Sequence, residues 1–263
     1  MSFDLFEGDS PLILSFPHSG TDIPGDIARG LVSKTQALAD TDWYVPRLYG
    51  FARDLGVSWV EAKTSRTVID LNRDPDGHSL YPGQTTTGLC PLESFDGVPL
   101  WQKGEGPTGA EIERRKNTHF ILYHKAISDQ IARVKARHGF AVLYDCHSIR
   151  GTVPRLFDGD LPVLNLGTNS GQSCAPDLEN RVGGMMARCS YTHAINGRFK
   201  GGWITRHYGR PDESVHALQM EIAQHAYMDE APLCVWHDDR AQGLQNALND
   251  VLETIVDWAA RHA

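Results

Sequence analysis

Two short apolar runs that each lead to a histidine place the strongest constraint on how this chain can fold. The first run, Leu12–Phe16, precedes His18, and the second, residues 140–144, precedes His147. Short apolar runs that open directly into polar turns are typical of buried strands. In open α/β sheets, ligands bind just beyond the carboxyl ends of such strands. The pattern therefore predicts an α/β fold in which two imidazoles from distant parts of the chain meet at one edge of a sheet.

Two imidazoles at one sheet edge can hold a metal ion, or each can simply form hydrogen bonds there. Neither His18 nor His147 has a second ligand close by at the spacing of a structural zinc site. A catalytic metal, which keeps one coordination position open for water, is therefore the better interpretation. Such a site also needs an acidic ligand. The candidates are Asp42, which is otherwise a helix N-cap, and Asp22, on the loop after His18.

The remaining segments alternate between strand and helix patterns. Strands are predicted at residues 57–62, 67–71, 162–166 and 216–222, and helices at residues 42–55, 108–138, 177–189 and 244–258. Residues 73–107 show no period, and a connection of that length is usually functional or covers a site. His124, on the long helix, is expected to be solvated. The alternation predicts a layered α/β protein, with residues 1–263 forming a single domain.

Composition and charge narrow the range of partners. The net charge of −8 disfavours nucleic acid and anionic membranes, so any cationic site must be a local pocket. The five cysteines are odd in number and form no CxxC motif, which favours reduced thiols in the cytoplasm. The acidic N-terminus lacks the basic segment of a signal peptide, and no apolar stretch approaches the ~20 residues needed to cross a bilayer. We expect a cytoplasmic protein.

A group of polar side chains follows the predicted strand at residues 67–71. Arg66 precedes this strand, and Asn72 and Arg73 follow it. Arginine grips a carboxylate with two parallel hydrogen bonds, and a neighbouring amide adds a donor. These residues are candidates for binding an anionic substrate, although Arg73 could instead form a salt bridge with a nearby aspartate.

Glu221 lies within an otherwise apolar strand pattern. Alternation places Gln219 and Glu221 on the face opposite Leu218 and Met220. A carboxylate in such a strand is costly unless it is paired or functional. Beside a metal site it would be a general base, and otherwise it would be the buried partner of an arginine.

Together, these residues resemble the N-formylglutamate amidohydrolase (N-formylglutamate deformylase) family, a relative of the zinc carboxypeptidases. The string at residues 70–73, Asp-Leu-Asn-Arg, is similar to the carboxylate-gripping motif of those carboxypeptidases. The matching segments follow the family's order over nearly the whole chain: residues 17–20, 40–43, 65–66, 70–73, 86–89, 145–148, 156–159, 165–169, 196–209 and 219–221.

The resemblance implies a zinc-carboxypeptidase-like fold, a three-layer domain with a central mixed sheet. It also implies zinc-dependent hydrolysis of the small molecule N-formyl-L-glutamate to L-glutamate and formate, late in histidine degradation. One Zn²⁺ per chain would be held by His18, His147 and an acid, for which the family pattern favours Asp42 over Asp22. Glu221 would act as general base.

The substrate of this family carries two carboxylates, and the resemblance assigns the arginines to them. Asn72 and Arg73 would grip one carboxylate, with Arg66 near the oxyanion or the same carboxylate. The glycine-rich segment at residues 196–209 would supply Arg206, together with Arg198, for the other.

The chain departs from the family pattern at two positions, and two other functions stay open. Trp203 stands where a histidine is expected, and Cys146 where a small residue is usual. The first alternative is a metal amidohydrolase for another N-acyl acidic amino acid. The second is a non-catalytic binder of acidic metabolites with a structural metal.

Overall fold

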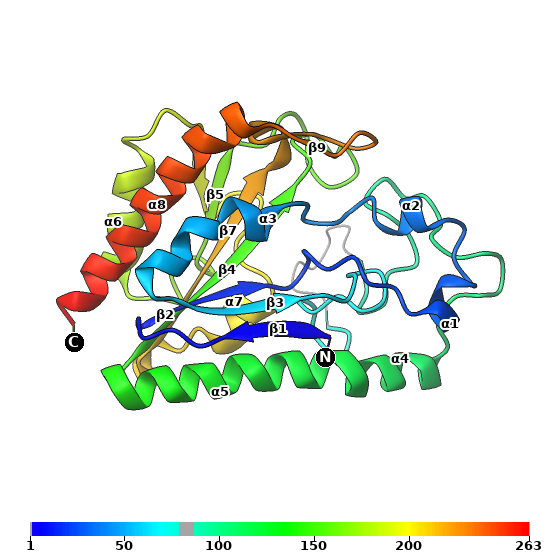
Figure 1. Ribbon diagram of the computed structural model, residues 1–263, viewed down its shortest axis with the longest axis horizontal. Helices are drawn as coiled ribbons and strands as arrows, with labels where there is room; N and C mark the ends of the chain where they lie inside the picture. Colours follow the sequence, from blue (N-terminus) through cyan, green and yellow to red (C-terminus); the bar gives the residue numbers. More distant parts are fainter. Residues whose placement is uncertain (1, 79–86, 263) are drawn as a thin grey trace.

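The computed structural model describes residues 2–78 and 87–262, and its centre is a mixed sheet of seven strands in the order β1-β3-β2-β4-β7-β5-β6 (Figure 1). The four middle strands are parallel: β3 (Ser58–Ala62), β2 (Leu12–Phe16), β4 (Ala141–Ile149) and β7 (Val215–Ala223). The strands β1 (Phe3–Phe6) and β5 (Leu164–Gly167) add antiparallel to this group, and β6 (His193–Ile195) pairs with β5. The predicted strands that lead to the two histidines are β2 and β4, and they are direct neighbours.

Helices cover both faces of this sheet, which confirms the predicted fold class of a three-layer α/β protein with a central mixed sheet (Figure 1). The long helix α5 lies on one face and is joined to α4 by a π-helical segment at Lys116–Phe120; the other face is covered by α6, α8, α3 and a 3₁₀ segment at Gly50–Leu55. The bounds are α3 (Val45–Leu48), α4 (Gly109–Arg115), α5 (Ile121–His138), α6 (Pro176–Met186) and α8 (Asp238–Ala260). Shorter elements complete the fold: α1 (Gly25–Ala28), α2 (Lys34–Ala37), α7 (Trp203–Tyr208), β8 (Met228–Asp229) and β9 (Val235–Trp236).

Alternation along the middle strands separates the apolar core from the chemistry. On β4, Tyr144 and Cys146 belong to the core under α6 and α8, whereas Leu143 belongs to the core under α5. Because successive side chains point to opposite faces, Asp145 and His147 share the face of Leu143. The register pairs Asp145 with Gln219 and His147 with Glu221 on β7. Four polar side chains thus gather on one face, near the carboxyl ends of parallel strands.

Two predicted elements differ from the structure. Residues 67–71 form turns rather than a strand, although Val68, Ile69 and Leu71 are buried in the core under α5. Their apolar character reflects this burial and not strand pairing. The helix predicted at residues 42–55 starts only at Val45, because Tyr44 has a left-handed backbone (φ 60°) and is the N-cap. Asp42 therefore does not cap this helix, and its carboxylate is available for other contacts.

The long helical segment follows its sequence signals closely. The Thr108 side chain accepts a hydrogen bond from the Glu111 N–H, as a capping box requires, and Gly139 ends α5 in the left-handed region (φ 82°). The expectation that His124 is solvated is wrong, because its ring packs under α7, 7% exposed. Among the described residues, no helix is long and apolar enough to cross a membrane.

Candidate active site

Three buried side chains meet at the carboxyl ends of β2 and β4. One ligand atom from each of His18, Asp42 and His147 lies within 4.8 Å of the other two. The backbone explains the meeting of the first two, because the Asp42 N–H donates to the His18 carbonyl oxygen (3.1 Å). The structure thus brings Asp42 to the histidines, whereas Asp22 is exposed on the loop beyond and stands outside this group.

Each histidine is oriented by a second carboxylate. The Nε2 atom of His18 lies 2.7 Å from Asp70 Oδ1, and the Nε2 atom of His147 lies 2.8 Å from Asp145 Oδ2. Both Nδ1 atoms therefore face Asp42. The Oδ2 atom of Asp42 lies 3.0 Å from His147 Nδ1 and 3.7 Å from His18 Nδ1. A carboxylate that holds the far nitrogen of a ligating histidine is the usual support of a protein metal site. Two nitrogen donors and one carboxylate fit a zinc ion with an open position.

The charged groups at this position shift one another's pKa values. Burial would raise the pKa of Asp42, yet hydrogen bonds from His147 and His18 hold it well below its usual range. Burial would likewise lower the pKa of His147, but the carboxylates of Asp145 and Asp42 hold it well above its ordinary value. Without a metal, His147 is therefore a cation between two anions, and a metal dication would take the place of its proton.

Arg66 ties two members of this group together. Its NH2 group donates to Asp70 Oδ2 (2.8 Å), its NH1 group lies 3.4 Å from Asp42 Oδ1, and its guanidinium lies 4.8 Å from the Phe95 ring centroid. The residue is only 6% exposed. The guanidinium group of Arg66 therefore contacts both Asp70, which binds His18, and Asp42, which faces both histidines.

Glu221 lies across from His147 on the neighbouring strand. It is 7% exposed, and burial raises its pKa to about 8. Gln219 Nε2 donates to its Oε2 atom (3.2 Å), and Gln219 Oε1 accepts from the Gly202 N–H (2.7 Å). The alternation predicted for this strand is confirmed, because Gln219 and Glu221 both border the cavity beside the histidines.

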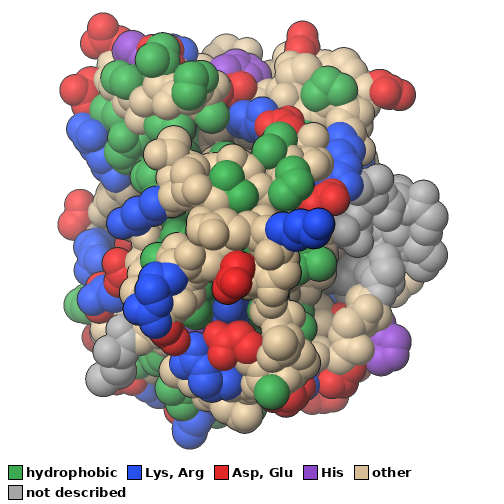
Figure 2. Space-filling model, turned by 90° about the vertical axis from the view of Figure 1, so that its right-hand side faces the viewer, with side chains coloured by type: hydrophobic (Ala, Val, Ile, Leu, Met, Phe, Trp, Pro, Cys, Tyr) green, Lys and Arg blue, Asp and Glu red, His purple; other side chains and the backbone are tan. Residues whose placement is uncertain are grey.

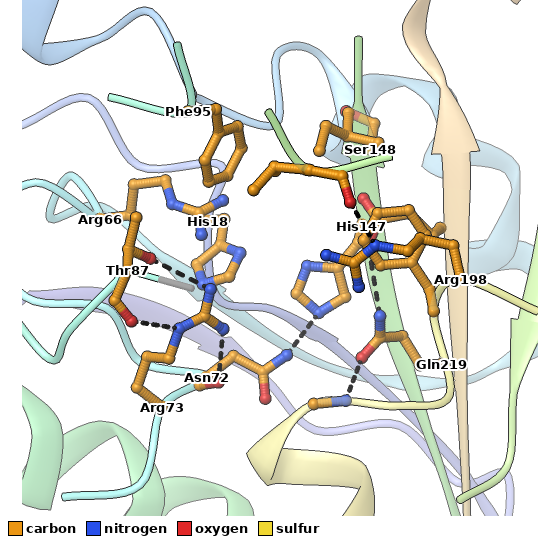
Figure 3. A pocket seen from close by; sticks show the side chains of 15 residues that line it. His18, Arg66, Asn72, Arg73, Thr87, Phe95, His147, Ser148, Arg198 and Gln219 are labelled. Atoms are coloured by element: carbon orange, nitrogen blue, oxygen red, sulfur yellow. Dashed lines mark hydrogen bonds between the residues drawn. The ribbon is translucent and has the colours of Figure 1, made fainter. Parts of the chain in front are cut away.

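A cavity opens over these groups, and its walls differ in character (Figure 3). One wall carries Arg66, Arg73 and Thr87, and across from it lie His147, Gln219 and Arg198. Its apolar lining comes from Phe95, Ile149, Leu156 and Phe199. Figure 2 looks onto this end of the molecule, where cationic and anionic side chains are interspersed.

Two arginines of the cavity are held by backbone oxygens. Arg73 donates to the Thr87 carbonyl (3.1 Å), to Thr87 Oγ1 (3.1 Å) and to the Asn72 carbonyl (3.2 Å). The Nε atom of Arg198 donates to the Leu156 carbonyl (2.7 Å). Both side chains border the cavity, and they approach it from different sides (Figure 3).

The structure does not place every expected residue at this cavity. Arg206 lies on α7, where its Nε donates to the Gly201 carbonyl (2.9 Å), and it stands outside the described residues that line the cavity. The segment expected to be one glycine-rich loop turns helical at Trp203, which separates Arg206 from Arg198. Asn72 does border the cavity, but its amide bonds to protein groups. Of the matching segment at residues 86–89, Thr86 lies outside the described residues.

Sequence reasoning assigned no role in the site to three of its residues. Asp70, one of the aspartates near Arg73 in the sequence, lies 3.8 Å from Arg73, but its shorter contacts are with His18 and Arg66. Gln219 was correctly placed on the strand face of Glu221, but its contact with that carboxylate was not predicted. Phe95 comes from the aperiodic stretch, where no sequence signal marks it.

An α/β sheet that brings three potential metal ligands and a buried carboxylate to one cavity is typical of hydrolases. Comparison with known proteins identifies the family. The family model "N-formylglutamate amidohydrolase" matches residues 10–228. The chain is 47% identical over 252 residues to N-formylglutamate deformylase of Pseudomonas aeruginosa, covering 95% of this chain and 94% of that protein. It is 46% identical over 255 residues to the protein of the same name from Pseudomonas putida, covering 97% and 95% of the two chains.

A solved structure gives the same result. The crystal structure of N-formylglutamate amidohydrolase from Ralstonia eutropha JMP134 superimposes with a TM-score of 0.85 at 28% identity, covering 100% of this chain and 99% of that one. The chain belongs to the N-formylglutamate amidohydrolase family and is a hydrolytic enzyme. The predicted resemblance is confirmed, and the alternative of a non-catalytic binder is wrong.

Proposed function

We propose that this enzyme hydrolyses N-formyl-L-glutamate to L-glutamate and formate with the help of one zinc ion. The observation that carries the proposal is the buried group of His18, Asp42 and His147 beside Glu221, in a cavity bordered by separate arginines. The names of the Pseudomonas relatives support the substrate. A place late in histidine degradation is part of the same proposal and rests on the family.

His18 Nδ1, His147 Nδ1 and the Asp42 carboxylate would hold the zinc ion. When bound there, the ion would supply Lewis-acid chemistry: it lowers the pKa of water and polarises the formyl oxygen. Asp70 and Asp145 keep both imidazoles in the tautomer that presents Nδ1, because they accept from the Nε2–H groups. Arg66 holds Asp42 and Asp70 in place, so we assign it to the geometry of the catalytic group.

Glu221 would move the proton of the reaction. Its carboxylate takes a proton from the attacking water as the oxygen bonds to the formyl carbon. It then returns that proton to the glutamate nitrogen as the C–N bond breaks. In the metal-free protein, burial raises the pKa of this carboxyl group to about 8, which favours its role as the acid that returns the proton to the nitrogen. A dication bound at the neighbouring ligands would favour the carboxylate form that accepts the proton from water. Gln219 orients the carboxylate through its hydrogen bond to Oε2.

Arg73 and Arg198 would bind the two carboxylates of the substrate. Both border the cavity, and their backbone contacts fix where the guanidinium groups lie. We place the α-carboxylate at Arg73 and the side-chain carboxylate at Arg198. Arg206 is the alternative for the side-chain carboxylate.

Release of glutamate, the product common to all N-acylglutamates, from a panel of these compounds tests this function. N-formylglutamate should be cleaved far faster than N-acetylglutamate or N-succinylglutamate, and treatment with a chelator should stop the reaction. Faster cleavage of the acetyl or succinyl compound would favour the alternative of an amidohydrolase for another N-acyl acidic amino acid.

Two further expectations belong to this proposal. We propose that residues 1–263 form a single catalytic domain, because strands from Phe3 to Ala223 share one sheet and α8 packs against it. We also propose that the enzyme works in the cytoplasm, which the five free thiols support.

A further inference from the structure

The amide of Asn72 is held at both ends by protein groups. Its Nδ2 atom lies 3.1 Å from Asp145 Oδ2 and 3.0 Å from His147 Nε2. Its Oδ1 atom accepts from the Ile204 N–H at 2.7 Å, in the first turn of α7. The residue is 2% exposed. Figure 3 shows the side chain reaching across the floor of the cavity towards His147.

The orientation of this amide is fixed by its partners. The Ile204 N–H is a donor, so the oxygen of Asn72 must face it, and the NH₂ group is then directed to the Asp145 carboxylate. The backbone at Gly202 also packs directly against this side chain, because a Cβ atom there would clash with it. The amide therefore binds the carboxylate that orients His147.

The backbone around Asn72 is anchored to the same site. The Asn72 N–H donates to Asp70 Oδ1 (2.9 Å), and that oxygen also contacts His18 Nε2. The preceding carbonyl of Leu71 accepts from His124 Nε2 (2.9 Å). Residues 70–72 thus support both histidines, one through Asp70 and the other through Asn72 and Asp145.

We propose that Asn72 is a positioning residue for the metal ligand His147 rather than a ligand of the substrate carboxylate, an inference that rests on the metal site proposed above. Its amide keeps Asp145 against His147 and joins this pair to the start of α7. Of the two neighbours Asn72 and Arg73, only Arg73 then binds the substrate carboxylate. Loss of the amide should loosen the imidazole and weaken metal binding.

The test compares Asn72→Ala with Arg73→Ala in zinc affinity, measured by competition with a chromogenic chelator, and in kcat and KM at saturating zinc. Loss of a group that supports a metal ligand typically costs about 10- to 100-fold in affinity. We expect a loss in this range for Asn72→Ala, with a lower kcat and little change in KM. Arg73→Ala should raise KM and keep the zinc affinity of the wild type.

Two additional measurements separate positioning from general damage. The Co²⁺-loaded Asn72→Ala protein should show altered visible absorption bands, which a merely less stable protein would not. Asp145→Asn should also weaken zinc binding, and the double variant should lose less than the product of the two single losses, because the residues act as one unit.

Wild-type zinc affinity and an unchanged Co²⁺ spectrum in Asn72→Ala, with KM raised as in Arg73→Ala, would make Asn72 a substrate ligand and overturn the inference. If Asn72→Ala does not fold, Asn72→Ser takes its place in the same comparison. A wild-type protein that binds no zinc would instead refute the proposed function, so the two failures are distinct.

Discussion

Glu221 is a candidate general base that the sequence pattern proposed and whose surroundings the structure describes. It interrupts an apolar strand, lies opposite His147, and is buried with a pKa raised to about 8. Because positioned acid–base groups contribute roughly 10²–10⁴-fold to rates, Glu221→Gln should lower kcat within or beyond that range. Metal content should stay at the wild-type level. The control is Glu213→Gln on the exposed surface, and near-normal turnover of Glu221→Gln would reduce Glu221 to a structural role.

The arginines of the cavity give a second prediction for single residues. A hydrogen bond to a charged group is worth roughly 1.5–3 kcal/mol, or about 10- to 150-fold in kcat/KM. Arg198→Ala should lose that factor on N-formylglutamate and little on N-formylglutamine, which lacks the side-chain carboxylate. Arg73→Ala should weaken both substrates alike, because both carry the α-carboxylate.

This comparison also decides between two arginines. Arg181, exposed on α6, is the matched control and should change neither substrate when replaced by alanine. If Arg206→Ala, and not Arg198→Ala, shows the selective loss on N-formylglutamate, the side-chain carboxylate lies at Arg206. Equal losses on both substrates for Arg198→Ala would remove Arg198 from that role.

Among the structural elements, the irregular segment at residues 66–73 contributes most to the site. It supplies Arg66, Asp70, Asn72 and Arg73, and it is anchored to α5 by His124. Burial lowers the pKa of His124 to about 3, so the ring is neutral and its Nε2–H donates to the Leu71 carbonyl. The helix thus holds the segment from behind.

Replacement of His124 should therefore reduce stability. His124→Ala leaves the buried Leu71 carbonyl without its donor, which costs about 1–3 kcal/mol. For a chain of this size that lowers Tm by roughly 2–4 °C per kcal/mol. Scanning calorimetry measures the shift, with the exposed His193→Ala as control. Equal Tm values for the two variants would contradict the anchoring role of His124.

Prediction from sequence succeeded for elements that bury a regular pattern. The strands β2, β4 and β7 could be predicted because apolar runs and alternation reflect their place in the middle of the sheet. The short edge strand β1 was missed, because its residues are largely exposed and show no such pattern. Residues 67–71 were predicted as a strand because turns can bury apolar side chains as well as strands do.

Prediction of the site residues succeeded and failed for similar reasons. His18, Asp42, His147 and Glu221 could be proposed because three lie on or just after strands and the fourth lies in a family string. Which arginine faces the cavity could not be predicted, because a glycine-rich segment has no period that fixes where Arg198 or Arg206 points. The role of Asp70 depends on a turn that sequence reasoning interpreted as a strand.

For the molecule as a whole, metal binding should be linked to pH. The carboxylates of Asp145 and Asp42 outweigh burial and keep His147 protonated above its ordinary pKa in the metal-free protein. A ligating imidazole must be neutral, so zinc binding should release a proton near neutral pH, and affinity should rise as pH increases towards that raised pKa. Titration calorimetry in buffers of different ionisation enthalpy measures the proton. Identical heats in all buffers would contradict this linkage.

The central claim is that the enzyme hydrolyses its substrate with one zinc ion held by His18, Asp42 and His147. The most direct test determines metal content and formate release on the same samples of wild type, His18→Ala and His147→Ala, with the exposed His193→Ala as control. We predict about one zinc per chain in the wild type and the control, with activity that a chelator abolishes and zinc restores. The two ligand variants should lack both metal and activity. Full formate release from wild-type protein without bound metal would contradict the account.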